Sequence, residues 1–148
     1  MSHLLTRFVA VLCVAVTVLA FSGNTSAQTM PYSARGTAQF VSPTDFVGSG
    51  RATHLGNYSE VGSVAFAPTS NPAVLAVSGS IIYTAANGDQ LHANLNGTLN
   101  TSTGAIAAAV TYVGGTGRFV NASGSSNLAG QMLGGGAVTV AVAGSINY

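Results

Sequence analysis

Apolar and polar residues alternate with a period of two along most of this chain, and the alternation predicts short β-strands. The clearest example is Gln90–Leu99, where apolar or small residues occupy the odd-numbered positions and polar residues the even-numbered ones. Such a pattern is typical of a sheet with one buried and one hydrated face. Beyond residue 27 no segment has convincing helical periodicity.

Further alternating segments are separated by glycine, asparagine, proline and serine, and Asn87-Gly88 between two of them indicates a type I′ hairpin turn. The expected strands are residues 34–41, 48–56, 58–66, 74–85, 90–99, 106–113, 119–132 and 137–146, of which 48–56 and 119–132 are interrupted by glycines. About eight short, regularly spaced strands predict an all-β sandwich or barrel. We favour a small antiparallel barrel, because closure removes the exposed sheet edges.

The first 27 residues have the features of a secretory signal peptide. His3 and Arg7 precede an apolar stretch from Phe8 to Phe21, and Thr25-Ser26-Ala27 supplies small residues for a cleavage site. We therefore expect cleavage after Ala27 and a secreted or periplasmic protein. The apolar stretch is short for a membrane span, so we expect no stable span after cleavage.

The remaining chain of about 120 residues is long enough for one domain and too short for two. Residues 28–47 contain two prolines and one short extended stretch, so we expect an N-terminal extension there, followed by a barrel domain over residues 48–148. The only cysteine, Cys13, lies in the predicted signal peptide. The core must then hold the domain together without a disulfide.

The charge content is low and balanced after residue 27. It consists of three basic and three acidic residues and includes no lysine: Arg35, Arg51, Arg118, Asp45, Glu60 and Asp89. Nucleic-acid binding is excluded on this composition, because affinity for a phosphate backbone comes from many Lys and Arg contacts. A neutral surface also gives little charge repulsion against self-association.

Four short motifs, taken in order, point to one family. They are 52–56 (ATHLG), 84–91 (TAANGDQL), 114–119 (GGTGRF) and 144–148 (GSINY). The ordered set resembles secreted bacterial proteins with an allene oxide cyclase-like barrel, and the GGTGRF turn is similar to a glycine-rich segment of plant dirigent proteins, whose fold is related. The resemblance covers residues 48–148.

The resemblance implies an eight-stranded antiparallel barrel of calycin-like shape, with a central cavity for an apolar ligand. It also implies a homo-oligomer, because plant members of the fold are trimers. The catalytic residues of the plant cyclase and the acidic pair of the dirigent proteins have no counterparts in this sequence, so the resemblance carries over the scaffold alone.

Four residues are candidates for chemistry inside a hollow barrel: Glu60, His54, Tyr83 and Tyr112. Glu60 is the only glutamate. If its side of the strand faces inward, burial would raise its pKa and make it a candidate acid or base. We favour the alternative interpretation, an ordinary surface charge. His54 either packs against a neighbouring strand or lines a cavity.

Arg118 follows the glycine turn directly, and two interpretations of it are open. It is either an anion-binding residue at the mouth of the barrel or a structural arginine. The structural interpretation is favoured, because a glycine-rich turn leaves several carbonyl groups that need donors. Asp89 or Glu60 could also pair with it.

These observations favour a secreted, non-catalytic barrel that binds a small apolar ligand or has a structural role. The first alternative is a cyclase or isomerase acting on a reactive lipid-like or phenolic intermediate. The second is a small outer-membrane barrel, although the chain has few aromatic residues for two girdles and few charges for a polar lumen. We expect no cofactor and no metal, because no phosphate loop, dinucleotide fingerprint or metal-ligand spacing is present.

Overall fold

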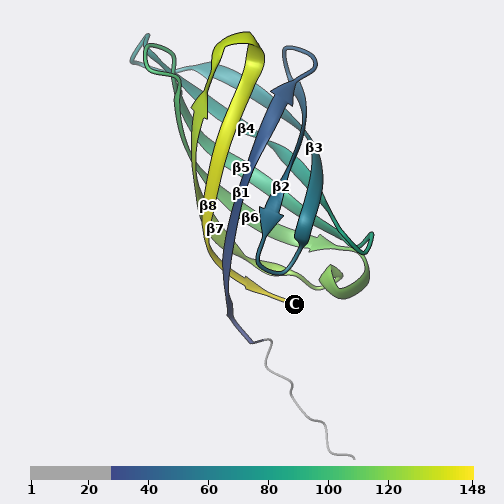
Figure 1. Cartoon of the computed structure of the whole chain (residues 1–148). Helices are drawn as coiled ribbons and strands as arrows, with labels where there is room; N and C mark the ends of the chain where they lie inside the picture. The colour runs from purple at the N-terminus through teal and green to yellow at the C-terminus, as the bar shows by residue number, and fades with distance from the viewer. Residues whose placement is uncertain (1–27) are drawn as a thin grey trace, which may run out of the picture.

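The computed structural model describes residues 28–148, and the predicted signal peptide over residues 1–27 lies outside them. The described chain forms a closed barrel of eight antiparallel strands (Figure 1). Each strand pairs with the next along the chain, and β8 pairs with β1 to close the ring. The all-β antiparallel barrel expected from the alternating pattern is therefore confirmed.

The strands are 8 to 13 residues long and are joined by short connections. They are β1 (Met30–Phe40), β2 (Asp45–Ala52), β3 (Gly56–Pro68), β4 (Val74–Ala85), β5 (Gln90–Asn100), β6 (Ala105–Gly115), β7 (Ser123–Met132) and β8 (Ala137–Asn147). Two single turns of 3-10 helix complete the fold, η1 (Gly117–Phe119) between β6 and β7, and η2 (Gly134–Gly136) between β7 and β8.

The barrel starts earlier in the chain than the sequence pattern indicated. The extension expected over residues 28–47 contains β1, which pairs with β2 on one side and β8 on the other. Without β1 the ring would be open between β2 and β8. The barrel domain therefore begins at Met30 instead of near residue 48.

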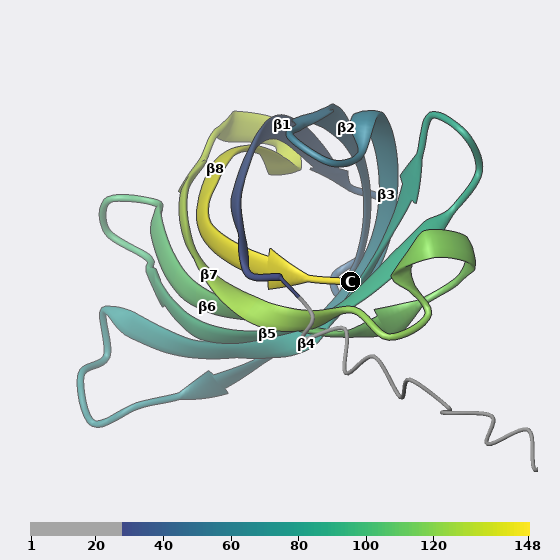
Figure 2. The ribbon, with the colours of Figure 1, turned by 90° about the horizontal axis from the view of Figure 1, so that it is seen from below.

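Side chains alternate strictly between the inside and the outside of the barrel. Along β3, Tyr58, Glu60 and Val64 are buried while Ser59, Val61 and Ser63 are exposed, and the other strands repeat this pattern. Inward positions are mainly apolar or glycine, and outward positions are mainly Ser, Thr, Asn and Ala. The core thus lies inside one ring of strands, which Figure 2 shows from below.

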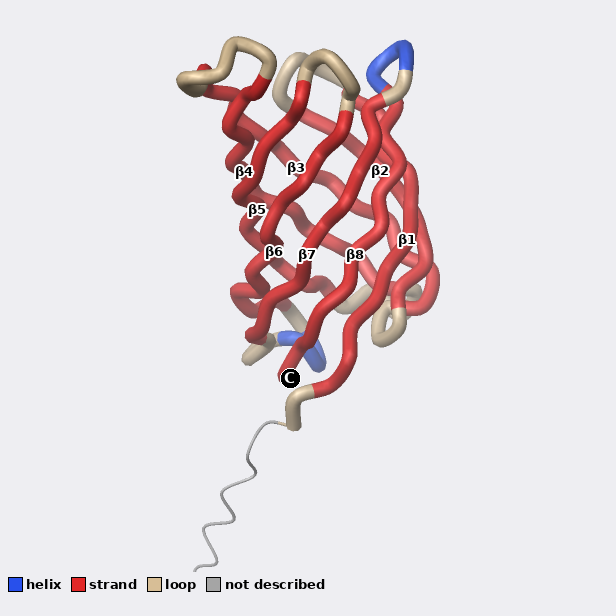
Figure 3. The backbone as a smooth tube through the Cα atoms, turned by 90° about the vertical axis from the view of Figure 1, so that its left-hand side faces the viewer, coloured by secondary structure: helices blue, strands red, loops and turns tan. Residues whose placement is uncertain are grey.

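The two ends of the barrel differ. η1 and the C-terminus lie at the lower end in Figure 1, whereas η2 lies at the upper end, as Figure 3 also shows. Large side chains at the lower end are almost fully buried, among them Leu55, Leu91 and Phe119. At the upper end Phe40, Phe66 and Met132 are only half-buried. The lower end is therefore closed by packing, and the upper end is the more accessible one.

The hairpin predicted at Asn87-Gly88 exists, but its turn is not of type I′. Four residues, 86–89, connect β4 and β5, and among them only Gly88 has a positive φ, of 90°. Type I′ requires a positive φ at both central residues. A hydrogen bond of 2.9 Å from the Gly88 N–H to the Ala85 carbonyl instead closes a turn that ends in glycine.

Residues 28–148 contain no helix with the length and hydropathy that crossing a membrane requires.

Candidate functional site

The barrel interior contains a cavity of about 70 Å³. On the same measure a single water molecule needs roughly 10–15 Å³, so the space exceeds that of one water several-fold. Its lining comes from all eight strands and is almost wholly apolar. The lining includes Ala38, Phe40, Phe46, Val64, Phe66, Val77, Ile81, Leu95, Leu99, Ile106, Leu128, Met132, Val138, Val140 and Val142. The remaining lining residues are Tyr58, Glu60 and Tyr83.

Glu60 points into this cavity, contrary to the interpretation favoured from the sequence. Its side chain is only 6% exposed. The reason is the strand register: Glu60 shares the inward side of β3 with Tyr58, Val64 and Phe66. A single glutamate cannot turn a strand outward against several large apolar neighbours, because a one-residue slip would expose all of them.

Small residues beside Glu60 leave room for its carboxyl group. Ala38, Gly48, Glu60 and Tyr83 stand in one cross-strand row over β1, β2, β3 and β4. A Cβ atom placed on Gly48 would lie 2.6 Å from Oε1 of Glu60. Any other residue at position 48 would have to displace the carboxyl, so the glycine is required for this side-chain placement.

The carboxyl group of Glu60 has no hydrogen-bond donor within residues 28–148. Burial raises the pKa of Glu60 from 4.5 to about 7, because water no longer solvates the charged form. The side chain therefore changes its protonation state near neutral pH. A buried group of this kind is an unusual feature in an otherwise apolar cavity.

Four buried tyrosines lie beside Glu60 and towards the closed end, with Tyr83 in its cross-strand row and Tyr58 at the next inward position of β3. Tyr58 and Tyr83 pack edge to face with ring centroids 5.4 Å apart, and Tyr32 and Tyr112 pack at 5.1 Å. Burial raises the pKa of all four phenols, that of Tyr112 to about 12. These hydroxyls are therefore neutral at physiological pH and can act only as hydrogen-bonding groups.

Of the two tyrosines named from the sequence, only Tyr83 lines the cavity. The hydroxyl of Tyr112 lies 2.8 Å from Oγ of Ser126, deeper in the barrel, and is occupied by that contact. Tyr58 and Tyr32 were not singled out from the sequence. Both stand on the inward side of alternating strands, and that periodicity is the signal that could have found them.

His54 does not join this group. It follows the end of β2 and is half-buried at the lower end of the barrel, where its Nε2–H donates a hydrogen bond of 2.8 Å to the Pro31 carbonyl. Its ring packs near Tyr148 and Tyr32, at centroid distances of 5.6 and 6.4 Å. His54 does not line the cavity that contains Glu60. The two residues therefore form no acid–base pair.

The GGTGRF segment closes the lower end. Gly114 and Gly117 have positive φ values of 94° and 56°, which lets the chain turn sharply after β6. Gly117–Phe119 form η1, so the strand expected over residues 119–132 begins only at Ser123. Phe119 is completely buried and packs on Tyr148 at 4.9 Å.

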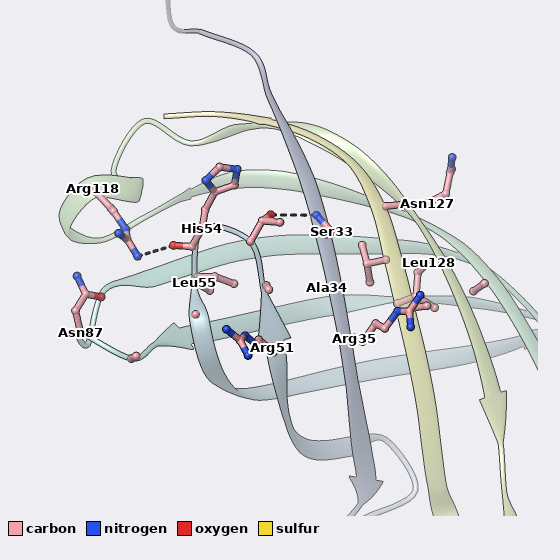
Figure 4. Close-up of a pocket in the computed structure, with 18 residues that line it drawn as sticks. Ser33, Ala34, Arg35, Arg51, His54, Leu55, Asn87, Arg118, Asn127 and Leu128 are labelled. Carbon is pink, nitrogen blue, oxygen red and sulfur yellow. Dashed lines mark hydrogen bonds between the residues drawn. The ribbon is translucent and has the colours of Figure 1, made fainter.

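Arg118 has a structural role in this arrangement. Its Nη2 donates a hydrogen bond of 2.6 Å to the His54 carbonyl, and its Nε lies 3.7 Å from Oδ2 of Asp89. Figure 4 shows the bond to His54 at the edge of an open hollow on the outside of the barrel, which Arg35 and Arg51 also line. The guanidinium thus ties the β2–β3 connection to η1 and the β4–β5 turn.

Arg118→Gln is expected to lower the free energy of unfolding by about 1 kcal/mol, measured by urea denaturation. The variant loses a charge-assisted hydrogen bond, but the side chain is 42% exposed and solvent screens its ion pair. Arg51→Gln is the matched control, because this exposed arginine has no ion pair within the described part of the chain. Equal losses in the two variants would contradict the structural role of Arg118.

No protein-family model matches the chain, and no curated protein matches it. The relationship to the allene oxide cyclase-like proteins therefore stays a prediction from the four sequence motifs. The evidence for the cavity and for the buried Glu60 carboxyl comes from the geometry of the structure alone.

Proposed function

We propose that this protein is an exported barrel that binds a small, mainly apolar molecule in its interior. The observation that carries the proposal is the apolar cavity with a single carboxyl group, that of Glu60, which accepts no hydrogen bond from residues 28–148. Binding sites for small molecules are typically apolar pockets with a few polar groups that orient the ligand. The half-buried Phe40, Phe66 and Met132 at the upper end provide the route of entry.

Export supports this role and is part of the proposal. The apolar stretch of residues 8–21 and the small residues before position 28 suit cleavage after Ala27. Cleavage there would leave two residues before the first strand of the barrel. A carrier or scavenger of small molecules outside the cytoplasm fits a disulfide-free barrel with a neutral, polar surface.

The outer-membrane alternative is disfavoured by the direction of the side chains. An outer-membrane barrel has an apolar outer band and a polar interior. In this barrel the outward positions carry Arg35, Arg51 and many Ser, Thr and Asn residues, while the inward positions are apolar.

Catalysis by a cyclase or isomerase is the second candidate, favoured by Glu60 itself. A carboxyl with a pKa near 7 is matched to proton transfer at neutral pH. Tyr83 is the only other candidate that shares the cavity with it. Recovery of a bound molecule in chemically altered form after incubation would favour catalysis over carriage.

Native mass spectrometry of the exported protein tests ligand binding directly. We expect an adduct of reproducible mass, which Ala38→Leu removes because the larger side chain fills the space next to Glu60. Thr37→Leu adds the same side chain on the outward side of β1 and should keep the adduct. An unliganded mass, together with no thermal shift on addition of small apolar alcohols, would contradict the proposal.

A further inference from the structure

The Glu60 carboxyl at the polar end of the cavity has neither a hydrogen-bond donor nor a positive charge beside it among the described residues. Glu60 is 94% buried by its 6% exposure, and none of the described residues donates a hydrogen bond to its carboxyl. An ionised carboxylate buried without a partner is strongly unfavourable, and a partner that brings a positive charge relieves it most. The protein itself offers no such partner inside the barrel.

Every basic residue of the described chain is accounted for elsewhere. Arg35 and Arg51 stand on outward positions of β1 and β2, and Arg118 binds the His54 carbonyl. His54 donates to the Pro31 carbonyl at the closed end, and His92 stands on the outward side of β5. A positive charge beside the Glu60 carboxyl can therefore come only from a bound molecule.

The groups around Glu60 can accommodate both the positive charge and the hydrocarbon part of a cationic ligand. The titratable ones are tyrosines, Tyr58 on β3, Tyr83 on β4, and Tyr32 and Tyr112 beyond them, and all stay neutral. Tyr58 and Tyr83 present aromatic rings beside the carboxyl, and ammonium groups are attracted to such rings. The cavity above is lined by aliphatic and phenylalanine side chains, which suit a compact hydrocarbon group.

We propose that the barrel binds a small apolar amine, whose protonated nitrogen pairs with the Glu60 carboxylate while its hydrocarbon part fills the cavity towards Phe40 and Phe66. The inference rests on the proposed function, because it names the class of ligand for the same cavity. Selectivity among ligands then comes from the single negative charge of Glu60 in an otherwise apolar cavity. Acids of the same shape would be excluded by repulsion.

The experiment compares three molecules of one shape, cyclohexylamine, cyclohexanol and cyclohexanecarboxylic acid, by titration calorimetry at pH 8. We expect the amine to bind at least tenfold more tightly than the alcohol, and the acid not to bind. Glu60→Gln should abolish the preference for the amine, so that the amine and the alcohol bind with affinities within about threefold of each other. Asp45→Asn, at an exposed position, is the control and should leave both affinities unchanged.

A second measurement uses the unaltered protein, so the test does not depend on the folding of a variant. Glu60 must be ionised to pair with the amine, and the amine stays protonated throughout. With a pKa of about 7 for Glu60, the affinity for the amine should fall about tenfold from pH 8 to pH 6. The affinity for the alcohol should fall little over this range.

The outcomes separate the two proposals. If the alcohol binds and the amine binds no more tightly, the amine inference is overturned and ligand binding stands. The same holds if the acid binds best, because Glu60 would then act as a neutral donor. If none of the three molecules binds, both proposals fail.

Discussion

Replacing Phe119 with alanine is expected to lower the free energy of unfolding by about 3–5 kcal/mol, the range for truncating a buried phenylalanine. The ring is completely buried at the closed end of the barrel. It packs on Tyr148, and the Arg118 guanidinium lies 4.8 Å from its centroid. Truncation would leave a void that η1, which is a single short turn, cannot collapse to fill. Urea denaturation followed by circular dichroism measures the loss.

Val120→Ala is the matched control for this prediction. Val120 is the next residue along the chain but is 62% exposed, so its truncation should change stability by less than about 0.5 kcal/mol. A loss of under about 1 kcal/mol for Phe119→Ala would show that the lower end is not closed by this ring.

The stability of the protein is expected to fall by about 3 kcal/mol between pH 4 and pH 8 because of Glu60 alone. The pKa of Glu60 rises from 4.5 to about 7 on folding, so between these values the native state holds a proton that the unfolded state has released. The native state binds more protons, and the free energy of unfolding therefore decreases as pH rises. About 2.5 pH units at about 1.36 kcal/mol each give the magnitude.

Glu60→Gln isolates this contribution. Its amide does not titrate, so the variant should lose the pH-dependent term and be the more stable protein at pH 8. The aspartates and histidines are present in both proteins, and their contributions cancel in the difference between the two curves of stability against pH. Parallel curves would contradict a buried Glu60.

Most of the fold could be predicted from the sequence, because each strand of a closed antiparallel barrel shows a local alternation of apolar and polar residues. Residues 90–99 and 74–85 correspond to β5 and β4 within one residue at each end. The errors fall where the alternation is interrupted. Pro31 and Pro43 made residues 28–47 resemble an extension, yet β1 tolerates Pro31 near its start and Pro43 lies in the connection to β2. η1 replaced part of an expected strand because glycine allowed a turn that period-two reasoning does not describe.

The candidate site was harder to predict because it depends on which side of each strand faces inward. Carboxylates generally stay in water, and this general rule favours an outward Glu60. The register of β3 overrides that rule, since Val64 and Phe66 must share the side of Glu60. His54 could not be placed from its strand pattern, because it stands in a connection where the alternation no longer determines direction.

The pairing of β1 with β8 has a consequence for how the chain folds into the closed barrel. It joins Met30 to Ile146 and Gln39 to Ala137, the contacts most distant in sequence, so it carries the highest loop-closure entropy and is expected to form last. Until then both outer strands present unpaired backbone groups to any neighbouring chain. The chain has no lysine that would disturb such pairing between edges. Aggregation is therefore most favoured in the brief interval before the barrel closes. A dilute compartment or a chaperone would protect the protein most during that interval.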